Sequence, residues 1–339
     1  MWKRVIETDV ANDENDLAGW EKVMLATLSL PGASGCLESW RMGFHKRTSL
    51  LHAAVKVGSE RLVEWVVERG GDLEEKNSER KSPLWAACRY GHVGVVRVLV
   101  EHGADMVGKD LSQSALIAAS QGGCLEVMRY LLGLGVLDVE ARDGQGHWPL
   151  SCACDYGDLD MVKVLVEEGG ADVDVEGKAG QGPLFWACRG GKVEIVRLLV
   201  DAGSGSGAGK EEDAGVWAAG LGVAAAYGHV EVVRELLDMG VGVDGVTNIG
   251  DTALALASQN GHTDIVRMLA ESGADVDKRG CAGFTPLHYA CEGGCEHLVR
   301  ILLEAGADAE VVDDEGDTAL DVATRGGWGE IVEVLEEWG

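Results

Sequence analysis

Two glycine-rich stretches contain residue types that could bind nucleotides. The segment GSGSGAGK (203–210) is similar to a phosphate-binding loop, in which backbone N–H groups and a lysine hold phosphate oxygens. Ser204 stands where that pattern requires glycine, and Glu211 stands where it requires serine or threonine. The segment GVGVDG (240–245) has the glycine spacing of a dinucleotide site, but it follows a predicted helix instead of a strand. The sequence therefore predicts no nucleotide and no other cofactor.

Cysteines and histidines are the other candidates for chemistry. Cys291, Cys295 and His297 lie close together, but no second pair completes a tetrahedral metal site. Most of the other cysteines and histidines recur at a fixed position of a repeated pattern. One position holds Cys88, Cys154, Cys188 and Cys291, and another holds His92, His229 and His262. This recurrence predicts that the cysteines pack in the interior and the histidines stabilise turns, instead of binding metal or acting in catalysis. No nucleophile motif is present, so we expect that the protein is not an enzyme.

Composition restricts the classes of partner. The formal net charge of −28 over 339 residues disfavours nucleic acid and anionic membrane surfaces. The longest uncharged run, 214–228, is shorter than the ~20 residues that cross a bilayer. Five acidic residues lie within the first 16 positions, where a secretory signal needs an apolar core. The nine cysteines are scattered along the chain, which fits a reducing compartment. We expect a cytoplasmic or nuclear protein.

A repeat of about 33 residues organises most of the chain. One glycine that closes a short helical segment recurs at intervals of 32 to 37 residues, at Gly58, Gly91, Gly123, Gly157, Gly191, Gly228, Gly261, Gly294 and Gly327. The segments before it include SPLWAACRYGH, GPLFWACRGG and FTPLHYACEGG, and each is followed by a stretch similar to VVRVLVEHGAD. This pattern resembles the ankyrin repeat family, whose T-P-L-H-x-A signature is matched best at Thr285–Ala290.

The resemblance implies an all-α ankyrin-repeat solenoid of about nine helix-turn-helix units, joined by short β-hairpin or finger loops. The residues of one unit support this fold. Thr285 is a suitable N-cap, and Pro286 lacks an N–H that would be unpaired at the first helical position. The glycines after Cys291 can adopt the left-handed conformation that ends a helix. One helix pair leaves an apolar face in water, so neighbouring units must stack to bury it.

The array has two predicted irregularities. Residues 1–43 do not match the repeat and are predicted to form an atypical N-terminal helical cap, so that the array runs over 44–339. Residues 203–215 are predicted to form a lengthened, flexible finger. The sixth unit follows, and we expect Gly220 and Gly222 to weaken its first helix.

The resemblance implies that a partner is recognised by the finger tips and by the exposed ends of the first helices, on the concave side. Aromatic and basic residues at those positions are the side chains that dominate interface energies. We predict that the contact residues are Arg80, Lys81, Arg89, Tyr90, Trp148, Tyr156, Arg189, Trp217, Tyr227 and Phe284. The expected function is a monomeric scaffold that binds a protein segment.

Three alternatives remain open at the level of sequence. Each tyrosine of this set could simply cover the glycine of the neighbouring unit, without a partner. Trp85, Trp148, Phe185, Trp186 and Trp217 could line a pocket for a small molecule or for catalysis. Residues 1–43 could dock on other machinery, which would make the protein an adaptor that delivers a bound client.

Overall fold

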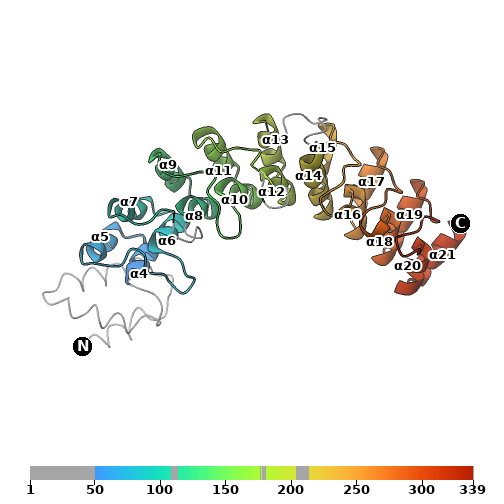
Figure 1. The fold of residues 1–339 in the computed structure, drawn as a ribbon, viewed down its shortest axis with the longest axis horizontal. Helices are drawn as coiled ribbons and strands as arrows, with labels where there is room; N and C mark the ends of the chain where they lie inside the picture. The colour runs from blue at the N-terminus through green and yellow to red at the C-terminus, as the bar shows by residue number, and fades with distance from the viewer. Residues whose placement is uncertain (1–49, 108–113, 176, 178–180, 204–213, 339) are drawn as a thin grey trace. The chain divides into compact units, whose positions relative to one another are not determined.

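The computed structural model describes residues 50–107, 114–175, 177, 181–203 and 214–338. These residues form nine consecutive helix pairs, as the repeat pattern predicts (Figure 1). They fall into two compact units: unit 1 holds residues 1–149 and 163–170, and unit 2 holds residues 150–162 and 171–339. The predicted cap at 1–43, and the predicted long finger from 204 to 213, lie outside the described residues.

Unit 1 contains three complete helix pairs. They are α4 (Leu50–Val57) with α5 (Glu60–Glu68), α6 (Pro83–Tyr90) with α7 (Val93–Glu101), and α8 (Ala115–Gly122) with α9 (Leu125–Gly133). The first helices pack in the order α4, α6, α8, and the second helices in the order α5, α7, α9. The fourth pair consists of α10 (Pro149–Tyr156), α11 (Leu159–Lys163) and the π-helix η2 (Val164–Glu168), and the division between the units falls within it.

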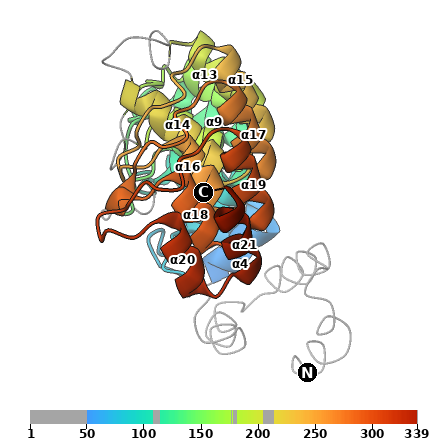
Figure 2. The same cartoon turned by 90° about the vertical axis from the view of Figure 1, so that its right-hand side faces the viewer.

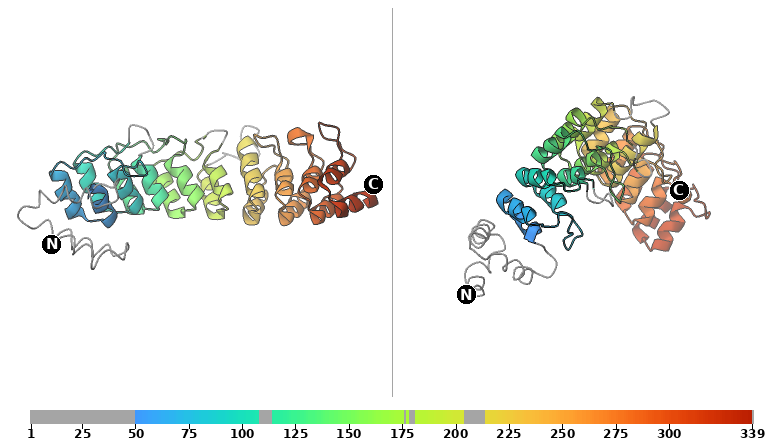
Figure 3. Two further views of the ribbon diagram at one scale, coloured as in Figure 1. Left: turned by 90° about the horizontal axis from the view of Figure 1, so that it is seen from below. Right: turned by 60° about the vertical axis from the view of Figure 1, so that its left-hand side comes forward.

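Unit 2 continues with five further pairs. They are α12 (Pro183–Arg189) with α13 (Val193–Asp201), α14 (Ala214–Ala226) with α15 (Val230–Asp238), α16 (Ala253–Gln259) with α17 (Thr263–Glu271), α18 (Pro286–Glu292) with α19 (Glu296–Glu304), and α20 (Ala319–Gly326) with α21 (Gly329–Trp338). The even-numbered helices from α12 to α20 form one layer, and the odd-numbered helices from α13 to α21 form the other (Figure 2). The fingers before α18 and α20 extend to the same side of these layers (Figure 3).

Local signals in the sequence set the helix boundaries. Thr285 caps α18 by accepting a hydrogen bond from the N–H of His288, and Pro286 is its first residue. Ser82 and Thr252 cap α6 and α16 in the same way. All nine of the closing glycines have left-handed φ angles, from 65° at Gly123 to 79° at Gly157. The glycine alignment that defined the repeat is thus also a structural alignment.

The core is built from equivalent positions of successive units. Leu84, Leu184 and Leu287 are buried in the first helices, and Leu99, Leu199 and Leu302 are buried in the second helices. The predicted cysteine position is also interior, because Cys88, Cys154, Cys188 and Cys291 are fully buried. Burial raises the pKa of these thiols, to about 12 for Cys291, so they remain protonated and pack as small apolar groups.

The second-helix segment of the fourth repeat contains one residue more than that of the other described repeats, and η2 accommodates it. In the other repeats the left-handed glycine after the second helix lies 12 positions beyond the closing glycine, as with Gly91 and Gly103. In the fourth repeat, Gly157 and Gly170 are 13 positions apart. The five residues of η2 form a π-helical turn, which accommodates an inserted residue within a helix. Val164 and Leu165 consequently remain buried.

Candidate partner-binding surfaces

Three tyrosines at one repeat position are exposed. Tyr90 ends α6, Tyr156 ends α10, and Tyr227 directly follows α14, each immediately before a closing glycine. Their exposed fractions are 52%, 58% and 55%, respectively. A tyrosine that merely covered a neighbouring glycine would lose most of its accessible surface, so these rings present aromatic area to solvent. Large exposed apolar groups of this kind are typical of interaction sites when they gather.

In unit 2, one of these tyrosines, Tyr227, belongs to a cation–aromatic cluster centred on Arg189. The Cζ atom of Arg189 lies 5.0 Å from the ring centroid of Trp186 and 5.7 Å from that of Tyr227. Its guanidinium also lies 3.7 Å from the carboxylate of Asp155, the neighbour of Tyr156. Arg189 therefore links three successive repeats through their first helices, and cation–π contacts of this type favour fixed ring positions.

Two histidines contact backbone carbonyl oxygens in the same region. The Nε2 atom of His229 lies 2.7 Å from the carbonyl oxygen of Arg189, and its ring stacks on Tyr227 at 6.3 Å between centroids. In the next repeat, Nε2 of His262 lies 3.0 Å from the carbonyl oxygen of Ala226. These contacts confirm the expected turn role for both histidines. They also fix the backbone that carries Arg189 and Tyr227.

The first-helix end between Tyr156 and Tyr227 has no side chain. A Cβ atom at Gly190 would lie 3.1 Å from the carbonyl oxygen of Asp155, which is tighter than most real Cβ contacts. Close backbone approach thus accounts for glycine at this position.

Unit 1 holds a second group of basic and aromatic residues. The Nζ atom of Lys81 lies 4.4 Å from the ring centroid of Trp85, and the Cζ atom of Arg89 lies 6.0 Å from the same ring. Tyr90 follows Arg89, and Arg80 is exposed at the tip of the finger that leads to α6. Lys81 and Arg89 thus share the ring of Trp85, and Arg80 and Tyr90 are their exposed neighbours in sequence.

Two of the predicted contact residues are interior. Trp148 is 1% exposed, with the guanidinium of Arg142 lying 5.1 Å from its ring, and Trp217 is 3% exposed. We expected Trp217 at a finger tip, but α14 begins at Ala214 and places it in the first turn, facing the core. Burial removes both side chains from the exposed set.

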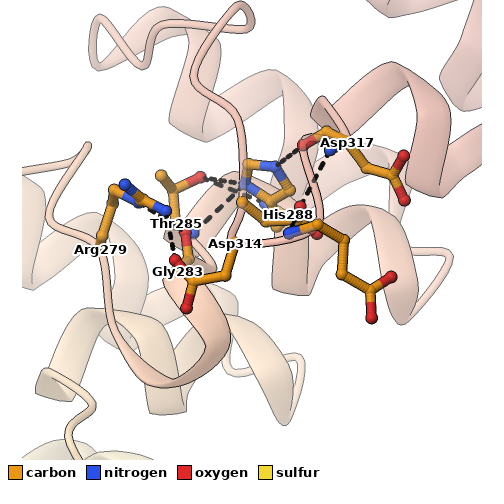
Figure 4. Close-up of polar contacts among 8 residues, drawn as sticks. Arg279, Gly283, Thr285, His288, Asp314 and Asp317 are labelled. Atoms are coloured by element: carbon orange, nitrogen blue, oxygen red, sulfur yellow. Dashed lines mark hydrogen bonds and ion pairs between the residues drawn. The ribbon is translucent and has the colours of Figure 1, made fainter.

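Phe284 is half-buried and belongs to the base of a finger. Its ring packs against those of His288 and Tyr289, at centroid distances of 5.4 and 5.2 Å. Beside it, Arg279 pairs with Asp314 of the next finger at 2.7 Å, and Nε2 of His288 lies 3.1 Å from the carbonyl oxygen of Asp317 (Figure 4). These bonds join adjacent fingers, so Phe284 has a packing role in addition to any contact role.

One buried polar group was not indicated by the sequence. The carboxylate of Asp251 accepts hydrogen bonds from the Tyr289 hydroxyl at 3.0 Å and from the Cys281 N–H at 2.8 Å. Burial, followed by the Asp251 charge, raises the pKa of Tyr289. The only local signal was Gly280, where any side chain would collide with Asp251. This arrangement fastens the finger before α18 to the preceding one.

One hollow of unit 2 differs from the predicted aromatic pocket. A hollow of about 510 Å³ lies between α15 and α17, and its lining includes Arg234, Leu237, Arg267 and Met268 but no aromatic side chain. Across the described ranges, no group of three or more histidine, cysteine or acidic residues could hold a metal ion. None of the helices described is both long and apolar enough to cross a bilayer.

Comparisons with known proteins agree with this fold. The family model "Ankyrin repeats (3 copies)" matches residues 50–143, 134–211, 210–280 and 277–339. The solved structure of the human ASB11 ankyrin repeat domain is similar, with a TM-score of 0.57 and 29% sequence identity, over 67% of this chain and 98% of that one. The comparison with curated proteins found no match. Because the family model covers nearly all of the described residues, the chain belongs to the ankyrin repeat family.

Proposed function

We propose that the protein binds a segment of a protein partner on the exposed ends of its first helices. Ankyrin repeats are generally protein-interaction modules, and proteins built from them are typically non-enzymatic scaffolds. The observation that carries the proposal is the exposure of Tyr156 and Tyr227, with Arg189 in contact with Tyr227 and with Asp155, the neighbour of Tyr156. Tyrosine and arginine are enriched among the residues that contribute most to interface free energy.

The cluster is arranged before any partner arrives. Arg189 contacts Asp155, Trp186 and Tyr227, and His229 holds the backbone of Arg189. Side chains that are already ordered lose less conformational entropy on binding, which favours affinity.

A peptide library displayed on phage and selected on the intact chain tests the proposal. For a selected peptide, we expect Tyr156→Ala and Tyr227→Ala each to weaken binding by about 1–2 kcal/mol, since both rings would lose buried contact area. Calorimetric titration measures this change. Val136→Ala is the matched control, because Val136 is 68% exposed but lies in the turn after α9.

The proposal also predicts that the two substitutions leave the fold intact, since neither ring is buried. Unchanged circular dichroism and thermal unfolding would verify this. Equal affinity of the double variant and the natural chain for every selected peptide would refute the proposed surface.

A further inference from the structure

At several junctions, the residue after a closing glycine covers the closing glycine of the preceding repeat. Histidine does this three times, and a Cβ atom added to the covered glycine would lie 2.7 or 2.8 Å from the imidazole: His92 covers Gly58, His229 covers Gly191, and His262 covers Gly228. In two of these cases, the Nε2 atom also lies within 3.0 Å of a carbonyl oxygen of the preceding repeat. Histidine at this position thus combines packing with a contact to the backbone.

The ninth repeat has Trp328 at this position. A Cβ atom added to Gly294 would lie 2.6 Å from the indole, so the ring covers the closing glycine of the eighth repeat. A Cβ atom added to Gly326 would lie 2.5 Å from the indole nitrogen. Gly326 directly precedes its closing glycine, as the three exposed tyrosines do. The indole therefore lies where a side chain at the tyrosine position of this repeat would begin.

Covering a glycine does not account for a tryptophan at position 328. Trp328 remains 40% exposed, whereas the three equivalent histidines are half-buried. The indole N–H can only donate a hydrogen bond, and within the described residues it meets no acceptor. An exposed aromatic ring with an unused donor is typical of a surface that contacts another molecule.

The two repeats around this ring are strongly acidic. From Thr285 to Trp338 the chain has fourteen acidic residues, two arginines and no lysine, which gives a net charge of −12 with neutral histidines. Both arginines already pair with carboxylates of the protein, Arg300 with Glu296 and Arg325 with Asp317. The charge of this region therefore favours a cationic ligand.

Two exposed carboxylates lie close in the chain to the indole and to the glycine that it covers. Glu292 ends α18, two residues before Gly294, and Glu330 lies in the first turn of α21, two residues after Trp328. Both glutamates are exposed, and neither forms an ion pair within the described part of the chain. A cationic group on the indole would consequently be attracted by carboxylates that are not already neutralised.

We propose that Trp328, together with Glu292 and Glu330, binds a basic segment of a protein partner, one rich in arginine and lysine. A guanidinium or ammonium group over a ring gains cation–π attraction, which is strongest on tryptophan. The carboxylates add charge-assisted hydrogen bonds. This surface goes beyond the proposed function, whose tyrosines lie in the fourth to sixth repeats.

Calorimetric titration of the intact chain with an arginine–glycine repeat peptide tests the proposal. Trp328→His is the main variant, because histidine covers the equivalent glycine in other repeats and should leave the fold intact. We expect this variant to bind the peptide about three- to tenfold more weakly, since it loses the cation–π contact with the indole. The double variant Glu292→Gln and Glu330→Gln should also bind more weakly, and added salt should reduce its difference from the natural chain.

The matched control is Trp338→Ala. Trp338 is 51% exposed and ends α21, roughly 15 Å along the helix axis from Trp328, so we expect unchanged affinity. A peptide with citrulline in place of arginine keeps the shape but not the charge, and it should bind much more weakly. Circular dichroism and an unfolding temperature within about 3 °C of the natural value would verify that Trp328→His is folded.

Three results would overturn the inference. Equal affinity of Trp328→His and the natural chain would show that the overall negative charge alone holds the peptide. Equal losses in Trp328→His and Trp338→Ala would show that the site is not localised at Trp328. Unchanged affinity in the double glutamine variant would contradict the role of the two carboxylates, and this test does not depend on the stability of Trp328→His.

Further outcomes separate this inference from the proposed function. Loss of affinity for the basic peptide in Tyr156→Ala and Tyr227→Ala, with Trp328→His unchanged, would overturn the inference and support the tyrosine surface. Binding that depends on Trp328, with no library peptide that depends on the tyrosines, would support the inference and overturn the tyrosine surface. Self-association that Trp328→His abolishes, without peptide binding, would identify a second copy of this chain as the ligand and overturn the inference.

Discussion

At the scale of single residues, both ring nitrogens of His288 are used in hydrogen bonds that stabilise the fold. Its Nδ1 atom accepts a hydrogen bond from the Thr285 N–H at 3.2 Å, and its Nε2 atom lies 3.1 Å from the Asp317 carbonyl oxygen. The neutral ring with a proton on Nε2 satisfies both contacts. A second proton on Nδ1 would face the Thr285 N–H, so this site disfavours the charged form.

This arrangement predicts a loss of stability in mild acid. Burial lowers the pKa of His288 and of His52 in the folded protein below their value of 6.5 in the unfolded chain. Between the two values only the unfolded chain binds the proton, so the free energy of unfolding decreases as the pH falls below about 6.5. The slope cannot exceed ~1.4 kcal/mol per pH unit and histidine.

Urea unfolding of the natural chain and of His288→Asn, at pH 7.5 and at pH 5.5, measures this effect. We expect the variant to be less stable at pH 7.5 but to lose less stability on acidification. An equal or larger loss in the variant would show that His288 is not a source of the pH dependence.

At the scale of elements, close packing accounts for two glycines inside one helix. Gly220 and Gly222, which are expected to weaken the first helix of the sixth repeat, both lie within α14, a continuous helix of 13 residues. A Cβ atom at Gly220 would lie 3.3 Å from the Cys188 sulfur, and one at Gly222 would lie 2.5 Å from a Thr247 methyl carbon. Glycine permits this close packing, which offsets its low intrinsic helix propensity.

The π-helical turn yields the prediction at this scale. Deleting Glu167, an exposed residue of η2, gives the fourth repeat the same spacing of left-handed glycines as the others. We expect the helix to become fully α-helical, with a change in unfolding free energy below about 1 kcal/mol, because no buried residue is removed.

Deletion of Glu304, an exposed residue at the end of α19, is the control for the Glu167 deletion. That helix has no spare residue, so Gly306 would lose its left-handed position, and we expect a loss of about 2 kcal/mol or more. Denaturant unfolding compares the two. Equal losses would mean that η2 does not accommodate an insertion.

At the scale of the whole molecule, the repeat contacts make stability a sum of neighbouring terms. Successive first helices pack on one another from α4 to α8 and from α12 to α20, and successive second helices do so from α5 to α9 and from α13 to α21. Damage to one repeat should therefore weaken the adjacent repeats most.

Leu302→Ala in α19 and Leu99→Ala in α7 test this expectation, because both leucines are fully buried. Each should reduce stability by about 2–5 kcal/mol through cavity formation. In hydrogen exchange, Leu302→Ala should reduce protection mainly in α17–α21, and Leu99→Ala mainly in α5–α9. Uniform loss along the chain in both variants would indicate a single cooperative unit instead.

The sequence by itself determined the repeat, the capped helices and the buried cysteine position. These features depend on residues close together in the chain, such as Thr285 with Pro286, or on one glycine every 33 residues or so. The sequence also predicted that Tyr90, Tyr156 and Tyr227 share one repeat position, since each of them directly precedes a closing glycine. Only the tertiary structure decided that Trp148 and Trp217 face the interior, that Asp251 meets Tyr289 from 38 residues away, and that Arg189 lies between Trp186 and Tyr227. Those contacts depend on how closely neighbouring repeats approach, and packing between distant residues sets that distance.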